Sequence, residues 1–169
     1  MTFRNPCAAA ACVLNFVLVI GPPTITFAAA DVPPGVARLL DEAEIVVVGA
    51  ADRTESLWKE NSRGDKVIVS RTLVRTREGL KGETENAIWV DVEGGSIDGV
   101  TLRVSGSTLL NAGDQAVLFL QRNADGIYTL HEHGRGVLKL DDRDVVRGTT
   151  IALEDIRQAA ASVNARGRR

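Results

Sequence analysis

Apolar and polar positions alternate in short segments along most of this chain, and the pattern predicts a mainly β protein. The apolar segments are rich in Val, Leu and Ile and are separated by glycine-containing turns such as 94–95 and 112–114. We expect strands at 45–48, 66–77, 87–92, 97–104, 115–121, 127–131 and 137–140, with a further short strand at 145–146. Short strands at this close spacing are typical of a small antiparallel barrel or sandwich.

The longest alternation, over 66–77, predicts a strand that mixes polarity on both of its faces. One face carries Val67, Val69, Arg71, Leu73 and Arg75. A strand of this length is expected to bend or coil, and 80–82 closes it. The preceding segment, 52–65, is polar, and we expect it to form a loop after the apolar strand 45–48.

Two helices are expected, one at each end of the strand region. Apolar residues at 36, 39, 40 and 43 have the spacing of a short amphipathic helix over 36–43. The second helix spans 151–163, with Thr149 or Thr150 as its N-cap and two acidic residues in its first turn. The remaining tail, 164–169, is basic and contains glycine, so we expect it to be frayed and flexible.

Residues 1–30 have the pattern of a secretory signal peptide. Arg4 supplies the positive charge, 8–20 form an apolar run, and 28–30 are three alanines that a signal peptidase would recognise. We therefore expect three parts: a signal peptide at 1–30, a single β-barrel domain at 31–163 and the tail at 164–169. The exported protein would work in the periplasm or outside the cell.

Two alternative interpretations of the leader are a retained membrane anchor and a lipoprotein signal. A spanning helix needs about 20 predominantly apolar residues. Here Asn15 interrupts the run and 21–23, Gly-Pro-Pro, end it. A lipoprotein signal needs its cysteine after the apolar core, whereas Cys12 precedes most of that core. We expect cleavage, and no stable membrane insertion afterwards.

Composition narrows the chemistry that the exported part can perform. Both cysteines, Cys7 and Cys12, lie in the leader, so no thiol remains for a disulfide, a nucleophile or a metal ligand. Without the leader the chain has 19 basic and 22 acidic residues, a net charge of −3. It also has few aromatic residues. A nucleic-acid partner is therefore not expected, because such proteins need a basic groove and stacking platforms.

His131-Glu132-His133 is the segment with the clearest metal-ligand chemistry. On a strand, His131 and His133 would project from the same face and could both bind one ion. A catalytic zinc site needs a third protein ligand, and Asp141, Asp142 or Asp144 would have to supply it. We favour the other interpretation, a hairpin strand whose solvent side carries the two histidines, and therefore expect no metal site, with His131 and His133 as the alternative.

Two further motifs resemble known sites only in part. The acidic segment 141–144 lacks the spacing, the glycine and the terminal glutamate of an EF-hand loop, so we interpret it as a solvated turn. The segment 94–98 begins like a serine nucleophile elbow, but Asp98 stands where the elbow needs glycine. We therefore expect no catalytic triad with either histidine, no catalytic residue and no cofactor.

Trp58 is the main candidate for a contact residue. It lies in the polar segment, and exposed aromatic side chains are over-represented at binding hot spots. The alternative is that Trp58 folds back to cover one end of the barrel. Arg71 and Arg75 on the neighbouring long strand give a modest cationic stripe, which we include in the candidate binding surface. Trp89 falls within an alternating strand and is expected in the core.

The order of these features resembles a group of exported bacterial β-domains that are similar to the netrin and metalloproteinase-inhibitor version of the oligonucleotide/oligosaccharide-binding (OB) barrel. The shared pattern covers about 39–140 and includes Ile45-Val46-Val47-Val48-Gly49, Trp58, Leu80-Lys81-Gly82, Gly94-Gly95, Gly99, Val104-Ser105-Gly106, Gly113-Asp114 and Val117-Leu118-Phe119-Leu120. The resemblance implies a partly open OB-like barrel whose loops or open face hold a partner.

The resemblance does not imply protease inhibition. The inhibitors use an N-terminal cysteine, whereas the exported chain would begin Asp31-Val32-Pro33. The sequence thus favours a non-enzymatic binding module of the cell envelope that contacts a protein or a polysaccharide. The alternatives are a metal-dependent hydrolase that uses His131, Glu132 and His133, and a purely structural envelope subunit.

Overall fold

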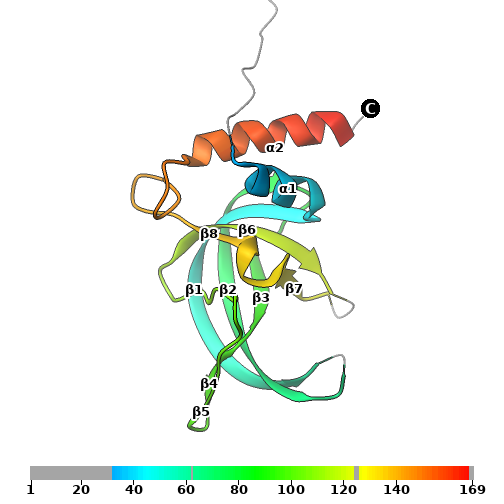
Figure 1. Ribbon diagram of the computed structural model, residues 1–169, viewed down its shortest axis with the longest axis vertical. Coiled ribbons are helices and arrows are strands. Elements are labelled where there is room, and N and C mark those ends of the chain that lie inside the picture. Colours follow the sequence, from blue (N-terminus) through cyan, green and yellow to red (C-terminus); the bar gives the residue numbers. More distant parts are fainter. Residues whose placement is uncertain (1–31, 62, 124–125, 168–169) are drawn as a thin grey trace, which may run out of the picture.

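The computed structural model describes residues 32–61, 63–123 and 126–167 (Figure 1). The helices are α1 (Pro34–Glu42), η1 (His133–Gly136, a 3-10 helix) and α2 (Leu153–Gly167). The strands are β1 (Ile45–Glu60), β2 (Lys66–Lys81), β3 (Ala87–Glu93), β4 (Gly95–Ile97), β5 (Val100–Leu102), β6 (Gln115–Arg122), β7 (Tyr128–Leu130) and β8 (Val137–Lys139). The signal peptide predicted at 1–30 lies outside the described residues.

Five strands close into a ring. The pairs β1–β2, β2–β3, β6–β7 and β1–β6 are antiparallel, and β3–β7 is parallel, so the circuit runs β1-β2-β3-β7-β6 and returns to β1. The predicted fold class is confirmed: the described chain is mainly β, with a five-stranded ring and a short helix near each end. The parallel pair is the departure from the antiparallel arrangement that we expected.

Strand β1 is much longer than predicted. Its polar half, 52–60, was expected to be a loop, and this prediction is wrong because these residues pair with β2 as far as Glu60↔Lys66. Register shifts in the β1–β2 pair bend the strand, so that its first half also pairs with β6. Gly49 permits the bend, since a Cβ there would lie 2.6 Å from Val74 Cγ1 and 2.8 Å from the Arg75 carbonyl oxygen.

Two apolar cores hold the described part of the chain together. The first fills the ring and includes Val47, Val74, Val90, Leu118 and Leu120. The second lies between the ring and the two helices and includes Leu40, Val46, Phe119, Leu153 and Ile156. Figure 1 shows α2 and α1 stacked across one end of the ring. Because consecutive residues of β1 and β6 face alternate sides, each of these strands contributes to both cores.

The C-terminal helix differs from its prediction at both ends. It begins at Leu153, and the Ala152 N–H donates to Asp155 Oδ2 at 3.0 Å, so neither threonine is its cap. Thr149 instead accepts a hydrogen bond from the Ile151 N–H, just before the helix. The helix continues to Gly167, where we had expected a frayed tail. Asn164 anchors this end by donating to the Leu80 carbonyl at 2.8 Å.

An arm of two hairpins projects from the ring on the side opposite the helices (Figure 1). It consists of the distal parts of β1 and β2, residues 55–60 and 66–70, and of the hairpin β4–β5. A single strand was predicted at 97–104, but Asp98 and Gly99 take positive φ angles of 52° and 77° and form a two-residue turn. Gly95 lets this hairpin lie close to β1 and β2, because a Cβ there would be 2.5 Å from Ser70 Oγ.

The Asp114 carboxylate joins three segments near the start of β6. It accepts hydrogen bonds from Lys139 Nζ at 2.7 Å and from the Asn111 N–H at 2.9 Å, and Arg147 Nη1 lies 3.4 Å away. Burial raises the pKa of Asp114, but the bonds and charges of these three partners outweigh it, so the pKa lies below its usual value of 3.8.

Replacing Asp114 is expected to make the free energy of unfolding depend less on pH in the acidic range. At pH 7, Asp114→Asn should lower the free energy of unfolding by about 1–3 kcal/mol, because a largely buried charged hydrogen bond is lost. A lowered folded-state pKa adds stability above the unfolded pKa, and protonation removes it. The difference between wild type and variant should therefore shrink as the pH falls below about 4. Urea denaturation at several pH values measures it, with the exposed Asp142→Asn as control.

Candidate functional site

Trp58 lies on a strand, in the distal half of β1, rather than in the loop that was predicted. Its Nε1–H donates to Asp98 Oδ2 of the β4–β5 turn at 3.2 Å, and Lys66 Nζ lies 5.7 Å from its ring centroid. The residue is 36% exposed. Trp58 thus links the two hairpins of the arm and still presents apolar surface to solvent.

A second exposed apolar side chain lies on the same arm. Val100, at the start of β5, is 49% exposed. Among the residues that the structure describes, Trp58 and Val100 are the large hydrophobic residues that are exposed. Large apolar side chains are normally buried, so their placement together on a projecting arm marks it as the candidate contact surface.

Arg71 and Arg75 do not lie on the same face as Trp58. Trp58 pairs with Ile68 across the β1–β2 ladder, whereas Arg71 pairs with Glu55. Since side chains alternate along a strand, both arginines point to the opposite face from Trp58. The structure therefore does not bring the three predicted binding residues together in one surface.

The two arginines are held by carboxylates on the outer face of the ring. Arg71 makes a bidentate ion pair with Asp91, through Nε at 2.7 Å and Nη2 at 2.9 Å. This hydrogen bonding to Asp91 raises the pKa of Arg71. The Asp91 side chain is 5% exposed and also lies 3.3 Å from Lys59 Nζ. Arg75 pairs with Asp52 at 2.9 Å in a more exposed position.

Trp89 was expected in the core, and this prediction is wrong. It is only half-buried, on the same face of the sheet as Arg71, and the Arg53 guanidinium carbon lies 5.1 Å from its ring centroid. Arg53 stacks on the ring and shields part of it from solvent, which favours a large aromatic side chain at this half-buried position.

The strand geometry predicted for the histidine pair is wrong. Strand β7 ends at Leu130, His131 and Glu132 form a turn, and His133 begins η1. The His133 side chain lies outside what the structure describes. Two of the three carboxylates considered as third ligands are engaged elsewhere: Asp141 accepts from the backbone N–H groups of its own turn, and Asp144 pairs with Arg77.

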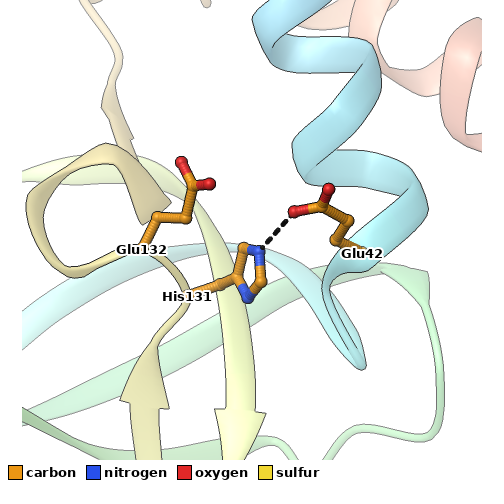
Figure 2. A group of neighbouring side chains, drawn as sticks. All are labelled: Glu42, His131 and Glu132. Carbon is orange, nitrogen blue, oxygen red and sulfur yellow. Dashed lines mark hydrogen bonds and ion pairs between the residues drawn. The ribbon is translucent and has the colours of Figure 1, made fainter.

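His131 instead meets two glutamates, which sequence reasoning did not select (Figure 2). Its Nε2 lies 3.1 Å from Glu42 Oε2 of α1, and potential ligand atoms of His131, Glu42 and Glu132 all lie within 4.8 Å of one another. Glu132 is also paired with Arg38 of α1, at 2.6 Å to one oxygen and 2.8 Å to the other. These contacts fix α1 to the turn after β7.

A cleft of about 530 Å³ opens beside this turn. Strands β3 and β7 pair through only two register positions, Val90↔Tyr128 and Asp91↔Thr129. The cleft lies next to this short pairing and is lined by Asp91, Glu93, Ser107, Gln121, Thr129 and His131, among others. It is the place where the ring is least tightly closed.

A larger hollow, of about 860 Å³, lies between the end of β2 and the last turns of α2. Two of its polar side chains, Lys81 and Asn164, already bond to the protein. Lys81 Nζ donates to the carbonyl oxygens of Leu40 and Asp41, at 2.8 Å each, and Asn164 holds the Leu80 carbonyl. These contacts close the C-terminal end of α1, so we assign the hollow a structural role.

Comparison with known proteins does not assign this chain to a family. No protein-family model matches this chain, and no curated protein matches its sequence.

The Arg71–Asp91 pair is expected to matter for stability. Arg71→Met should lower the free energy of unfolding by about 2–4 kcal/mol, because among the described residues it leaves Lys59 as the remaining counter-ion of a nearly buried carboxylate. The double variant Arg71→Met/Asp91→Leu should recover at least half of this loss. Denaturant titration measures both. A double variant no more stable than Arg71→Met would show that the buried charge is not the cause of the loss.

Proposed function

We propose that this chain is an exported, non-enzymatic binding module of the cell envelope that contacts a protein or polysaccharide partner through its arm. The observation that carries the proposal is the position of Trp58 and Val100, both exposed and both on the arm. Trp58 is the expected anchor, because tryptophan supplies much of the energy at binding hot spots. The outer-face arginines have a secondary role at most, since Arg71 is engaged with Asp91.

Two further observations support a scaffold that presents a contact surface. The ring, with one parallel pair between β3 and β7, is consistent with the resemblance to OB-like netrin and metalloproteinase-inhibitor domains, whose loops and open faces hold partners. The leader pattern at 1–30 supports export to the periplasm or the medium. Among the described helices, none has the length and hydropathy needed to cross a bilayer.

The metal-dependent hydrolase that the His131-Glu132-His133 pattern suggested has less support. It required both imidazoles on one strand face, whereas the two residues follow the end of β7. A structural envelope subunit would need a long exposed strand edge for pairing. Strand β5 of the arm offers an edge of only three residues, Val100–Leu102, whereas the distal half of β1 pairs with β2 alone among the described strands, so edge pairing would have to use β1.

Trp58→Ala is expected to weaken partner binding while leaving the protein folded. The partner would be captured from the envelope fraction of producing cells, purified, and titrated against each variant. Loss of a hot-spot tryptophan should weaken binding at least thirtyfold, which corresponds to about 2 kcal/mol. Thermal unfolding should show that the variant still folds cooperatively, because the side chain is 36% exposed.

Trp89→Ala provides a matched control, since it removes the same residue type from the opposite face of the sheet. It should lower stability and leave the affinity unchanged. Equal affinities of wild type and Trp58→Ala, or a larger loss of affinity in Trp89→Ala, would contradict the arm as the contact surface.

A further inference from the structure

We propose that Glu42, His131 and Glu132 form a Zn²⁺ site at the junction of α1 and the turn after β7. These residues come from two segments far apart in sequence, and potential ligand atoms of all three lie within 4.8 Å of one another. Figure 2 shows Glu42 pointing to His131, with Glu132 beside them. The site is separate from the arm, which is built from β1, β2, β4 and β5, so it goes beyond the proposed binding function and does not depend on it.

The donor set suits zinc. Zn²⁺ is bound by imidazole nitrogen and carboxylate oxygen at about 2.0–2.2 Å, which places neighbouring ligand atoms of a tetrahedral site roughly 3.3 Å apart. His131 Nε2 and Glu42 Oε2 are already 3.1 Å apart. The potential ligand atoms of all three residues lie within 4.8 Å, so only a small rotation of the partly exposed glutamates is needed.

The imidazole distinguishes this group from a cluster of acids. The His131 side chain is 12% exposed, and its backbone N–H donates to the Phe119 carbonyl at 2.8 Å. Its Nδ1 is buried and has no hydrogen-bond partner among the described residues. The imidazole makes its polar contact through Nε2, which lies beside Glu42. Nε2 is therefore the nitrogen that is placed to bind a metal.

Arg38 occupies the position of a competing cation. It lies one helical turn before Glu42 on α1, and its guanidinium bonds both oxygens of Glu132. The Arg38 side chain is half-exposed and can move into solvent when a metal binds. Because an internal counter-ion must be displaced, removing Arg38 should strengthen metal binding. If the three residues only held α1 against the turn, removing Arg38 would not strengthen metal binding.

The neighbouring cleft favours the binding of a cation and leaves room for a water molecule as a further ligand of the bound ion. His131 and Glu132 both line the cleft, as does the acidic residue Glu93, whereas the charge of Asp91, which also lines it, is already balanced by Arg71. Acidic lining raises the local concentration of cations. Three protein ligands leave at least one coordination position of a tetrahedral zinc open, and the cleft is the side from which that position is reached.

Isothermal titration of the untagged, chelator-treated protein with ZnCl₂ at pH 7.5 tests the proposal. Wild type should bind one Zn²⁺ saturably. Glu42→Gln and His131→Ala should each weaken binding at least tenfold, and Arg38→Met should strengthen it severalfold. Asp41→Asn is the matched control, because it removes one carboxylate from α1 whose ion pair is with Arg166 instead. This variant should bind like wild type.

Thermal unfolding gives a second measurement that stays informative if a variant is less stable. Zn²⁺ should raise the midpoint of wild type, and raise that of Arg38→Met further, since a ligand that binds only the folded state stabilises it by RT ln(1 + [L]/Kd), which is larger for a tighter site. Absence of saturable binding to wild type, binding that survives His131→Ala, or binding that Arg38→Met weakens or leaves unchanged would each overturn the proposal. Tight binding of Ca²⁺ with equal affinity would also overturn it, because a hard cation does not need the imidazole.

Discussion

The continuity of β1 is the constraint on which the rest of the structure depends. One 16-residue strand pairs with β6 through its first half and with β2 along nearly its whole length. This is possible only because the strand bends through a series of register shifts and because Gly49 allows β2 to approach without a Cβ in the way. The bend closes the ring at one end of β1 and projects the arm at the other.

This arrangement separates the residues that stabilise the fold from the residues that remain exposed. The apolar half of β1 is shared by both cores, so its residues are almost completely buried. The polar half extends past the ring, where β4–β5 covers one of its faces through Ser70, Gly94 and Gly95. Burial of apolar surface in two cores supplies the stability. The arm can therefore expose Trp58 and Val100 without weakening the ring.

Much of the fold follows from local patterns in the sequence. The alternation over 66–77, the apolar segment 115–121 and the amphipathic spacing at 36–43 each predicted an element that the structure contains. The polar half of β1 was missed because charged residues on an exposed hairpin alternate no more regularly than those of a loop. The β4–β5 hairpin was missed because a single glycine, Gly99, suits a bulge as well as a turn.

The candidate sites were harder to predict, because they depend on contacts between distant segments. The register of the β1–β2 hairpin decides that Trp58 and Arg71 face opposite ways, and the sequence did not show that the polar segment would form this hairpin. The partner of His131 is Glu42, 89 residues away, and only the packing of α1 against the ring brings them together. Acid-rich helix ends and histidines after short strands are the available signals, and they are too common to select this pair.

Site-specific photo-crosslinking in producing cells tests the central claim most directly, namely that the arm is the surface in contact with a partner. A photoreactive side chain would replace Val100 on the arm or, as the reference, the exposed Ala161 on α2. The account predicts a discrete adduct from position 100 and none from position 161. A discrete adduct from position 161, with none from position 100, would contradict it.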